Sequence, residues 1–236
     1  MVAGDFDSAR VKARIEQLFG AIPSRGAPTG PVAAGADASS KPTLTAVVKE
    51  TLEDNVELEK VVMAWQTPKH FAPGDAELDL LSTALSSGKA SRLYKALVYE
   101  QKLAQSVEAS QESGHIGSRF TVGVIARPGV SLDRIEAAID KELDALRKKP
   151  MTDDELVRAK NLVETDFVTR LESVRERAAL LNMYQADTKD PGFAAKDLER
   201  YRSATKEGIR DVAAKYLVPN ARVVMRVVPK KAGKAK

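Results

Sequence analysis

The sequence predicts an α+β fold, a two-layer sandwich in which helices pack on one face of a mostly antiparallel sheet. Short apolar stretches with strand patterning occur in pairs joined by brief turns, which favours antiparallel pairing. Segments with a helical spacing of apolar residues are grouped between these pairs. A length of 236 residues, 43% of them hydrophobic and 30% charged, is sufficient for one large globular domain or for one domain and part of another.

The first 22 residues predict the end of a strand at positions 2–4, followed by a helix that Asp7 caps. One apolar stripe runs along this helix, formed by Val11, Ile15, Leu18 and Ile22. Because nothing nearby in the sequence can bury that stripe, these residues are typical of the interior of a longer chain. Residues 23–42 are rich in Pro, Gly, Ala and Ser, which indicates a linker.

After the linker the pattern changes to that of a sheet. Residues 44–50 and 57–67 predict two strands. The second strand is apolar at both odd and even positions, so we expect it to be central and covered on both faces. Two helices and then a second pair of strands are predicted to follow, at Ala76–Leu85, Ser91–Gln101, Ser106–Glu112 and Ile116–Arg127.

The last part of the chain predicts three helices and a closing strand. Ser131 caps the first helix, and the capping box Thr152–Glu155 opens a long helix that we expect to reach about Ala186. A further helix is expected around Ser203–Tyr216. The stretch "NARVVMRVV" predicts a strand with Val223, Met225 and Val227 on one face.

Composition excludes several classes of function. The net charge of +4 comes partly from the tail "PKKAGKAK", and elsewhere Lys and Arg alternate with Asp and Glu as on solvated helix faces, so we predict no nucleic-acid binding. The absence of cysteine excludes disulfides and thiolate metal sites and leaves the compartment, periplasmic or cytoplasmic, open. No apolar run approaches the ~20 residues of a membrane span. The opening residues do not have the pattern of a signal peptide.

No catalytic motif is found in the sequence. Catalytic zinc usually has three protein ligands, whereas this chain has two histidines, His70 and His115, far apart in sequence and without an H-x-x-E-H or H-E-x-x-H motif. No G-x-S-x-G motif is present, and the paired acidic residues lie at helix starts, where capping explains them. The stretch "SSGKAS" has one of the two glycines that a phosphate loop requires. We therefore predict no catalytic residue and no metal ligand in this chain.

Several segments together resemble one family. They are "VAGDFDSARVKARIEQLFGAIP", "LDLLSTALSSGKASRLYKAL", "LAQSVEA", "GSRFTVGV" and "LDRIEAAIDKELDALRKKPMTDDELVRAKNLVETDF". In this order they resemble the pitrilysin/insulinase family of zinc metallopeptidases over nearly the whole chain. Such enzymes are built from two homologous halves of this α+β fold that face each other around a chamber. The first half carries the inverted H-x-x-E-H zinc site, and the second typically carries none.

The resemblance implies a domain organisation. Residues 1–22 would be the last strand and helix of a preceding zinc-bearing half, and 23–42 the linker between halves. Residues 43–230 would be the second, inactive half, and 231–236 a basic tail. Zinc would then be held by the missing half, either in the same polypeptide or in a partner chain, and this chain would need no cofactor.

The resemblance also suggests which residues contact substrate. The candidates for peptide binding are residues of the loop at the chamber wall, namely Ser86, Ser87, Gly88, Lys89, Ser91 and Arg92. The structural alternative is that Gly88 allows the break between two helices and that Ser91 caps the second helix. Active relatives often place an arginine and a tyrosine in this half that reach the substrate near the metal. Those positions are Val98 and Gln105 here, and the loss of one such donor can cost ~3 kcal/mol of transition-state stabilisation.

Two hypotheses follow. The first is that the chain is the non-catalytic C-terminal half of a zinc metalloendopeptidase, which encloses and helps to bind a peptide or protein substrate, with a homodimer as one possible assembly. The second is that it is a non-peptidase scaffold or binding subunit of the same fold, which the departures at Val98 and Gln105 favour. A nucleic-acid-binding role for the basic tail would require steeply salt-dependent binding, which we do not expect.

Overall fold

The structure is a computed structural model that describes residues 1–23, 44–115 and 117–230. From residue 24 on, the predicted linker lies outside the described residues, as does the predicted basic tail. The chain divides into two compact units, one of Met1–Pro42 with Phe167–Phe193 and one of Thr43–Asp166 with Ala194–Lys236, which we call the sheet unit. None of the described helices is both long enough and apolar enough to cross a membrane.

The N-terminal helix forms as predicted. Helix α1 (Ser8–Phe19) begins after Asp7, whose carboxylate accepts a hydrogen bond from the Arg10 backbone N–H at 2.7 Å. The strand end predicted at residues 2–4 is wrong, because these residues have no strand conformation. No residue of α1 is buried, and Leu18 is 55% exposed.

The long helix expected to reach Ala186 is interrupted. It consists of α4 (Asp153–Glu172) and α5 (Val174–Thr188), separated by Ser173. Ser173 has an extended backbone, and its hydroxyl accepts from the Glu176 N–H at 3.3 Å, as an N-cap does. The stretch "SVRE" is therefore a second start signal of the same kind as "TDDE". At the first start, Thr152 and Glu155 form the predicted reciprocal capping box.

The sheet unit holds a five-stranded sheet of order β1-β5-β2-β4-β3. Its strands are β1 (Val48–Asp54), β2 (Lys60–Thr67), β3 (Ala104–Glu112), β4 (Ser118–Ala126) and β5 (Val223–Pro229). The first and last strands in sequence, β1 and β5, pair in parallel, and the other three pairs are antiparallel. The predicted mostly antiparallel α+β sandwich is confirmed, with β1 starting four residues later than expected.

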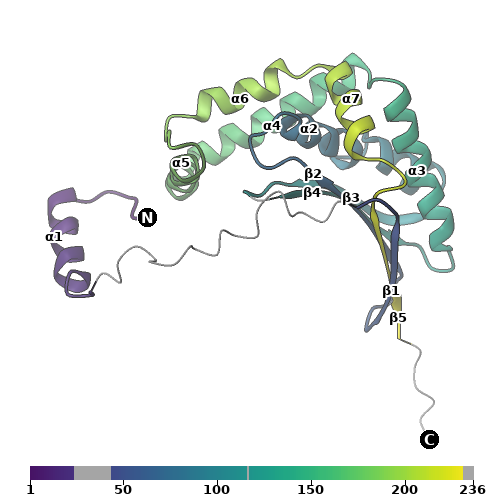
Figure 1. The fold of residues 1–236 in the computed structure, drawn as a ribbon, viewed down its shortest axis with the longest axis horizontal. Helices are drawn as coiled ribbons and strands as arrows, with labels where there is room; N and C mark the ends of the chain where they lie inside the picture. The colour runs from purple at the N-terminus through teal and green to yellow at the C-terminus, as the bar shows by residue number, and fades with distance from the viewer. Residues whose placement is uncertain (24–43, 116, 231–236) are drawn as a thin grey trace, which may run out of the picture. The chain divides into compact units, whose positions relative to one another are not determined.

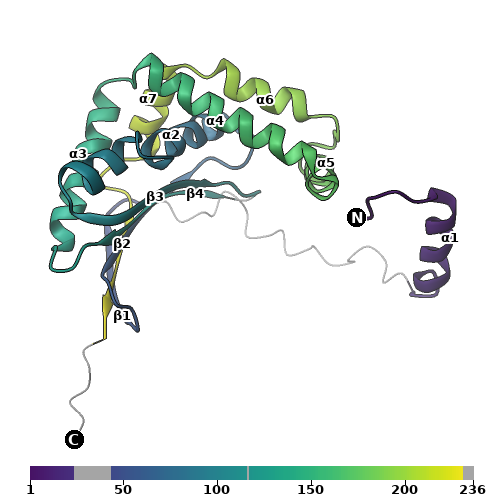
Figure 2. The same cartoon turned by 180° about the vertical axis from the view of Figure 1, so that it is seen from behind.

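The helices of the sheet unit are α2 (Asp75–Ser86), η2 (Tyr94–Glu100, a π-helix), α3 (Leu132–Lys148), α6 (Ala194–Ser203) and α7 (Lys206–Tyr216), together with the first part of α4. Of these, α6 was not expected from the sequence, and Ser131 caps α3 as predicted. Figures 1 and 2 show α2, α3 and α7 stacked along one side of the sheet, and all three contact its strands or one another.

Central strand β2 separates the two faces of the sheet. Val61, Met63 and Trp65 are at most 1% exposed and join the core beneath the helices. The expectation that both faces of this strand are covered is wrong, because Val62 and Ala64 on the opposite face are only half-buried. Within the described part of the sheet unit, no helix packs on that second face, which we call the open face.

The two faces predict losses of stability of different size for the same substitution. Val61→Ala leaves a cavity in the core beneath the helices, so we expect it to lower the free energy of unfolding by about 2 kcal/mol. Val62→Ala removes a half-exposed side chain and should cost less than about 1 kcal/mol. Urea denaturation of both variants measures the difference. Equal losses would mean that the open face is covered in the isolated chain.

Candidate functional site

A groove of about 390 Å³ lies on the open face of the sheet. Its walls come from β2, β3, β4 and β5, because alternate residues of neighbouring strands point to the same side. The register places Val62 between Gly123 on one neighbouring strand and Met225 on the other. The lining residues are Lys60, Val62, Ala64, Glu108, Ser110, Glu112, Arg119, Thr121, Gly123 and Met225.

The groove is apolar on one side and polar on the other. Met225, which is 40% exposed, lies next to Val62 and Ala64, and this side offers contact area for apolar side chains. Toward β3, Arg119 forms an ion pair with Glu112. Such a surface can contact a ligand through both apolar area and charge.

The hydroxyl groups of the groove are not activated nucleophiles. The Ser110 and Thr121 hydroxyls lie 2.8 Å apart and bond to each other across β3 and β4. A serine or threonine nucleophile needs a general base as its partner, and neither hydroxyl has one among the described residues. The groove can therefore bind a ligand but has no pair of groups that would begin a covalent reaction.

The two histidines lie on loops that meet. The His70 backbone N–H donates to the Gly114 carbonyl at 3.0 Å, next to His115, although the two histidines are 45 positions apart. Even so, over the described ranges 1–23, 44–115 and 117–230, no three His, Cys, Asp or Glu side chains are grouped closely enough to hold a metal ion. These residues do not fit a zinc site, which needs three or four such ligands.

The predicted substrate loop begins at the outer edge of the sheet. The Ser86 hydroxyl accepts from the Ala109 N–H at 2.9 Å and lies 3.3 Å from the Ala109 carbonyl oxygen. Ala109 belongs to β3, the edge strand, and points these backbone groups away from β4. Ser86 thus provides a hydrogen-bond partner for both outward backbone groups at the middle of the edge strand.

The rest of the loop braces two helices. Gly88 has φ +79°, a left-handed conformation that favours glycine, and separates α2 from the next helical turn. The Ser91 hydroxyl is buried and donates to the Gly88 carbonyl at 2.6 Å, so it closes this turn and does not cap a helix N–H as expected. Ser87 and Lys89 complete the loop, and Lys89 is exposed.

Arg92 makes a bidentate ion pair with Glu155, the capping-box residue of α4, at 2.6 and 2.7 Å. Partial burial by itself would raise the pKa of Glu155. Hydrogen bonds from Arg92 and Thr152, together with the Arg92 charge, lower that pKa to about 2. None of the six predicted substrate residues lines the groove of the open face.

The two positions where active relatives carry donors are also placed by the structure. Val98 lies in η2 and packs against the core, and its carbonyl accepts from Arg127 at 3.3 Å. Gln105 is exposed at an irregularity of the β3–β4 register, between Ala104 and Ser106. Neither residue lines the groove.

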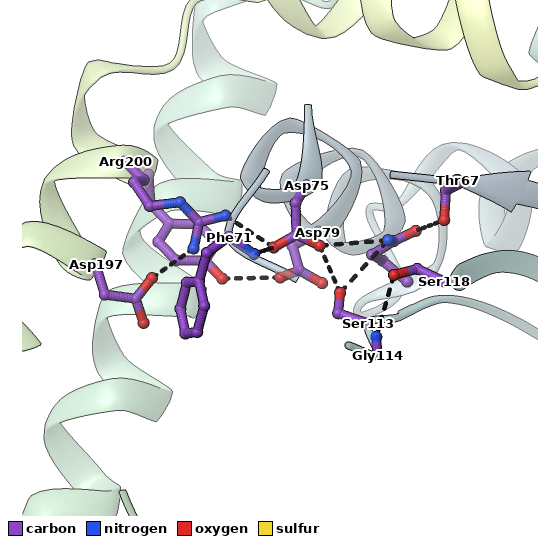
Figure 3. Close-up of polar contacts among 11 residues, drawn as sticks. Thr67, Phe71, Asp75, Asp79, Ser113, Gly114, Ser118, Asp197 and Arg200 are labelled. Carbon is purple, nitrogen blue, oxygen red and sulfur yellow. Dashed lines mark hydrogen bonds and ion pairs between the residues drawn. The ribbon is translucent and has the colours of Figure 1, made fainter. Parts of the chain in front are cut away.

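A buried polar cluster joins α2, α6 and the β3–β4 turn (Figure 3). Arg200 donates to Asp197 at 2.7 Å and to the fully buried Asp75 at 2.8 Å. Asp75 also accepts from Ser113 at 2.5 Å and from the Phe71 N–H at 3.0 Å. Because Arg200 and Asp75 are 125 positions apart in sequence, this ion pair fixes α6 on the sheet unit.

Asp79 extends the cluster along α2 and accepts a hydrogen bond from the Tyr201 hydroxyl at 2.8 Å. Burial raises the pKa of Asp79 from 3.8 to about 7, the Tyr201 hydrogen bond opposes this, and the charge of Asp75 adds to it. Burial also raises the pKa of Tyr201. Sequence reasoning missed this cluster, although the position of Asp79 between Leu78 and Leu80 in an apolar helix was a usable signal.

Together these features define a class of protein. The chain contains a sheet with one face covered by helices and a groove on the other face. Among the described residues there is no metal-binding group, and the groove contains no activated nucleophile. These features are typical of an α+β domain that offers a surface groove.

Comparison with known proteins identifies the family. The sequence profile described as the peptidase M16 inactive domain matches residues 1–163, so the chain belongs to this family. It is 27% identical over 184 residues to the zinc protease PqqE of Helicobacter pylori, a match that covers 78% of this chain and 41% of that protein. The chain thus spans about two fifths of this curated relative.

Solved structures share the fold. A protease from Helicobacter pylori superimposes with a TM-score of 0.82 at 22% identity, over 96% of this chain and 54% of that chain. A peptidase M16 inactive domain from Pseudomonas fluorescens gives a TM-score of 0.68 at 18% identity, over 80% of this chain and 45% of that chain. The predicted resemblance to pitrilysin-type metallopeptidases is confirmed at the level of family and fold.

The pKa of Asp79 predicts how stability depends on pH. The folded state holds this proton up to about pH 7, whereas the unfolded chain loses it near pH 3.8, so the contribution is present at pH 3 and is lost as pH rises to 7. Asp79→Asn carries no such charge. We expect it to match the wild type near pH 4 and to be more stable at pH 8, on the order of 3 kcal/mol.

Urea denaturation of both proteins between pH 4 and 8 measures this difference, with Asp5→Asn, at an exposed position, as the control substitution. An Asp79→Asn protein with the same pH profile as the wild type would contradict a proton-bearing Asp79.

Proposed function

We propose that this chain is the non-catalytic C-terminal half of a zinc metalloendopeptidase and that it helps to enclose peptide substrate opposite a zinc-bearing half. The observation that carries this proposal is a grooved, uncovered sheet face in a chain that belongs to the peptidase M16 inactive-domain family. The zinc protease of Helicobacter pylori that it resembles is more than twice as long as the matched part, which leaves room for a second half.

The division of labour follows from the side chains. The described residues of this chain hold no metal-binding group, so the zinc that activates water belongs to the other half in this proposal. This half contributes surface. An extended peptide presents alternate side chains to one side, and the apolar strip of Val62, Ala64 and Met225 is suited to receive them.

The predicted loop takes a divided role in the proposal. Ser86, Ser91 and Arg92 hold the loop through their contacts with Ala109, Gly88 and Glu155. Ser87, Gly88 and Lys89 remain the part that can contact a peptide, and Lys89 supplies an exposed positive charge. Binding by these residues would be through the loop tip and would be separate from the groove.

The second candidate function is a non-peptidase scaffold of the same fold. Val98 and Gln105, which stand where active relatives carry an arginine and a tyrosine, favour it. Under that alternative the longer protein would bind peptide or protein without cleaving it. Cleavage by the longer protein therefore separates the two candidates.

A charge placed in the groove should weaken peptide binding in the longer protein. Thr121→Arg projects a long cation onto the open face, and we expect KM for an unstructured peptide to rise about tenfold with kcat within about twofold. Ala137→Arg, an exposed position of α3 on the helical layer, is the matched control and should change neither constant. An unchanged KM for Thr121→Arg would remove the open face from the substrate path.

The chain by itself should neither cleave peptides nor bind zinc tightly. We expect the 236-residue protein to show no hydrolysis of a fluorogenic peptide with added zinc. Isothermal titration with zinc should show no tight one-to-one site. A stoichiometric site lost in a double variant of His70 and His115 would mean that the two neighbouring loops form a metal site after all.

A further inference from the structure

Edge strand β1 presents a free edge. All seven of its residues are exposed, and its neighbour on one side is β5. Val48 donates its N–H to the Arg222 carbonyl, and the Asp54 carbonyl accepts from Lys230, so even-numbered residues face β5. The backbone groups of Lys49, Thr51 and Glu53 therefore point outward, and no described residue bonds them.

The opposite edge of the sheet is protected by contrast. There Ser86 occupies both backbone groups of Ala109 at the middle of β3, which blocks the addition of a strand. A free edge in an otherwise protected sheet is a site for pairing with another extended chain. The sequence of β1 indicates what that chain is.

The charges of β1 are complementary to β1 itself. In an antiparallel pair of two copies with Thr51 opposite Thr51, Lys49 of each copy stands opposite Glu53 of the other. The three outward-facing residues then all fall at hydrogen-bonded pairs, in which both N–H groups and both carbonyls are used. The remaining charges, Glu50 and Asp54, oppose Leu52 and Val48, so no like charges are directly opposed.

Other registers lose this match. A shift by two residues places Lys49 opposite Thr51 or leaves it outside the pair, and Glu53 loses its cation. The Lys49 side chain also contacts Glu136 of α3 at 3.1 Å, but it is 58% exposed and stays accessible to a second copy. The register centred on Thr51 is therefore the one that charge selects.

We propose that β1 pairs antiparallel with β1 of a second copy of this chain, centred on Thr51, so that two sheets join into one continuous sheet across a two-fold axis. The partner is a second copy because complementary charges and outward backbone groups coincide in one self-pairing register. This dimer does not depend on the function proposed above.

Charge reversal tests the register. In sedimentation equilibrium at low salt we expect the 236-residue chain to be a reversible dimer. Glu53→Lys places the new lysine of each copy opposite Lys49 of the other copy, so the dimer contains two repulsive pairs. The dimer dissociation constant should therefore rise about tenfold or more. Glu50→Lys makes the same charge change on the other face of β1, opposite Leu52, and should leave the constant within about threefold.

Mixing gives the sharper test. Lys49→Glu should weaken the dimer in the same way, and equimolar Glu53→Lys and Lys49→Glu chains should form a heterodimer, because both cross-strand pairs are again of opposite charge. Thr51→Pro removes the central outward N–H without touching the ladder to β5 and should leave a monomer with unchanged circular dichroism. A monomeric wild type, or a dimer that ignores Glu53→Lys and Thr51→Pro, overturns the proposal.

Discussion

The alternation of side chains along β2 is the constraint on which the sheet unit depends. Trp65 faces the core, where its ring meets Phe120 edge-on and its indole N–H donates to the Val218 carbonyl at 2.8 Å. That single hydrogen bond joins the central strand to the segment between α7 and β5. Because Trp65 is fixed on the helical side, its neighbours Ala64 and Gln66 must face the other way. One face thereby forms the core, and no described helix of the sheet unit packs on the other.

The covered side is reinforced by polar contacts as well as by apolar packing. The cluster of Asp75, Asp197 and Arg200 places ionised groups where burial is costly, which is tolerated because each is paired and hydrogen-bonded. The cluster also fixes two helices to each other, because the Arg200 guanidinium on α6 bonds Asp75 of α2. Arg92 does the same for α4 through Glu155. Arg92, which the sequence predicted to contact substrate, and Arg200, which it did not single out, thus both connect helices.

The open side and the two sheet edges then have different roles. The groove offers apolar area next to an ion pair, the β3 edge is closed by Ser86, and no residue that the structure describes bonds the outer edge of β1. The proposed binding of a peptide to the open face and the proposed pairing of two copies through β1 are compatible, because they use different atoms of the sheet. Both can therefore be tested in one protein.

The sequence alone determined the fold class, the caps at Asp7, Ser131 and Thr152, and most strand positions, because these follow from local patterns of period two or 3.6. It also determined that no zinc motif is present. Tertiary structure decided which face of β2 is covered, since strand parity shows two faces but not what packs on them. It also decided the partners of Arg92 and Arg200. Their ion pairs join residues 63 and 125 positions apart, so no local sequence pattern predicts them.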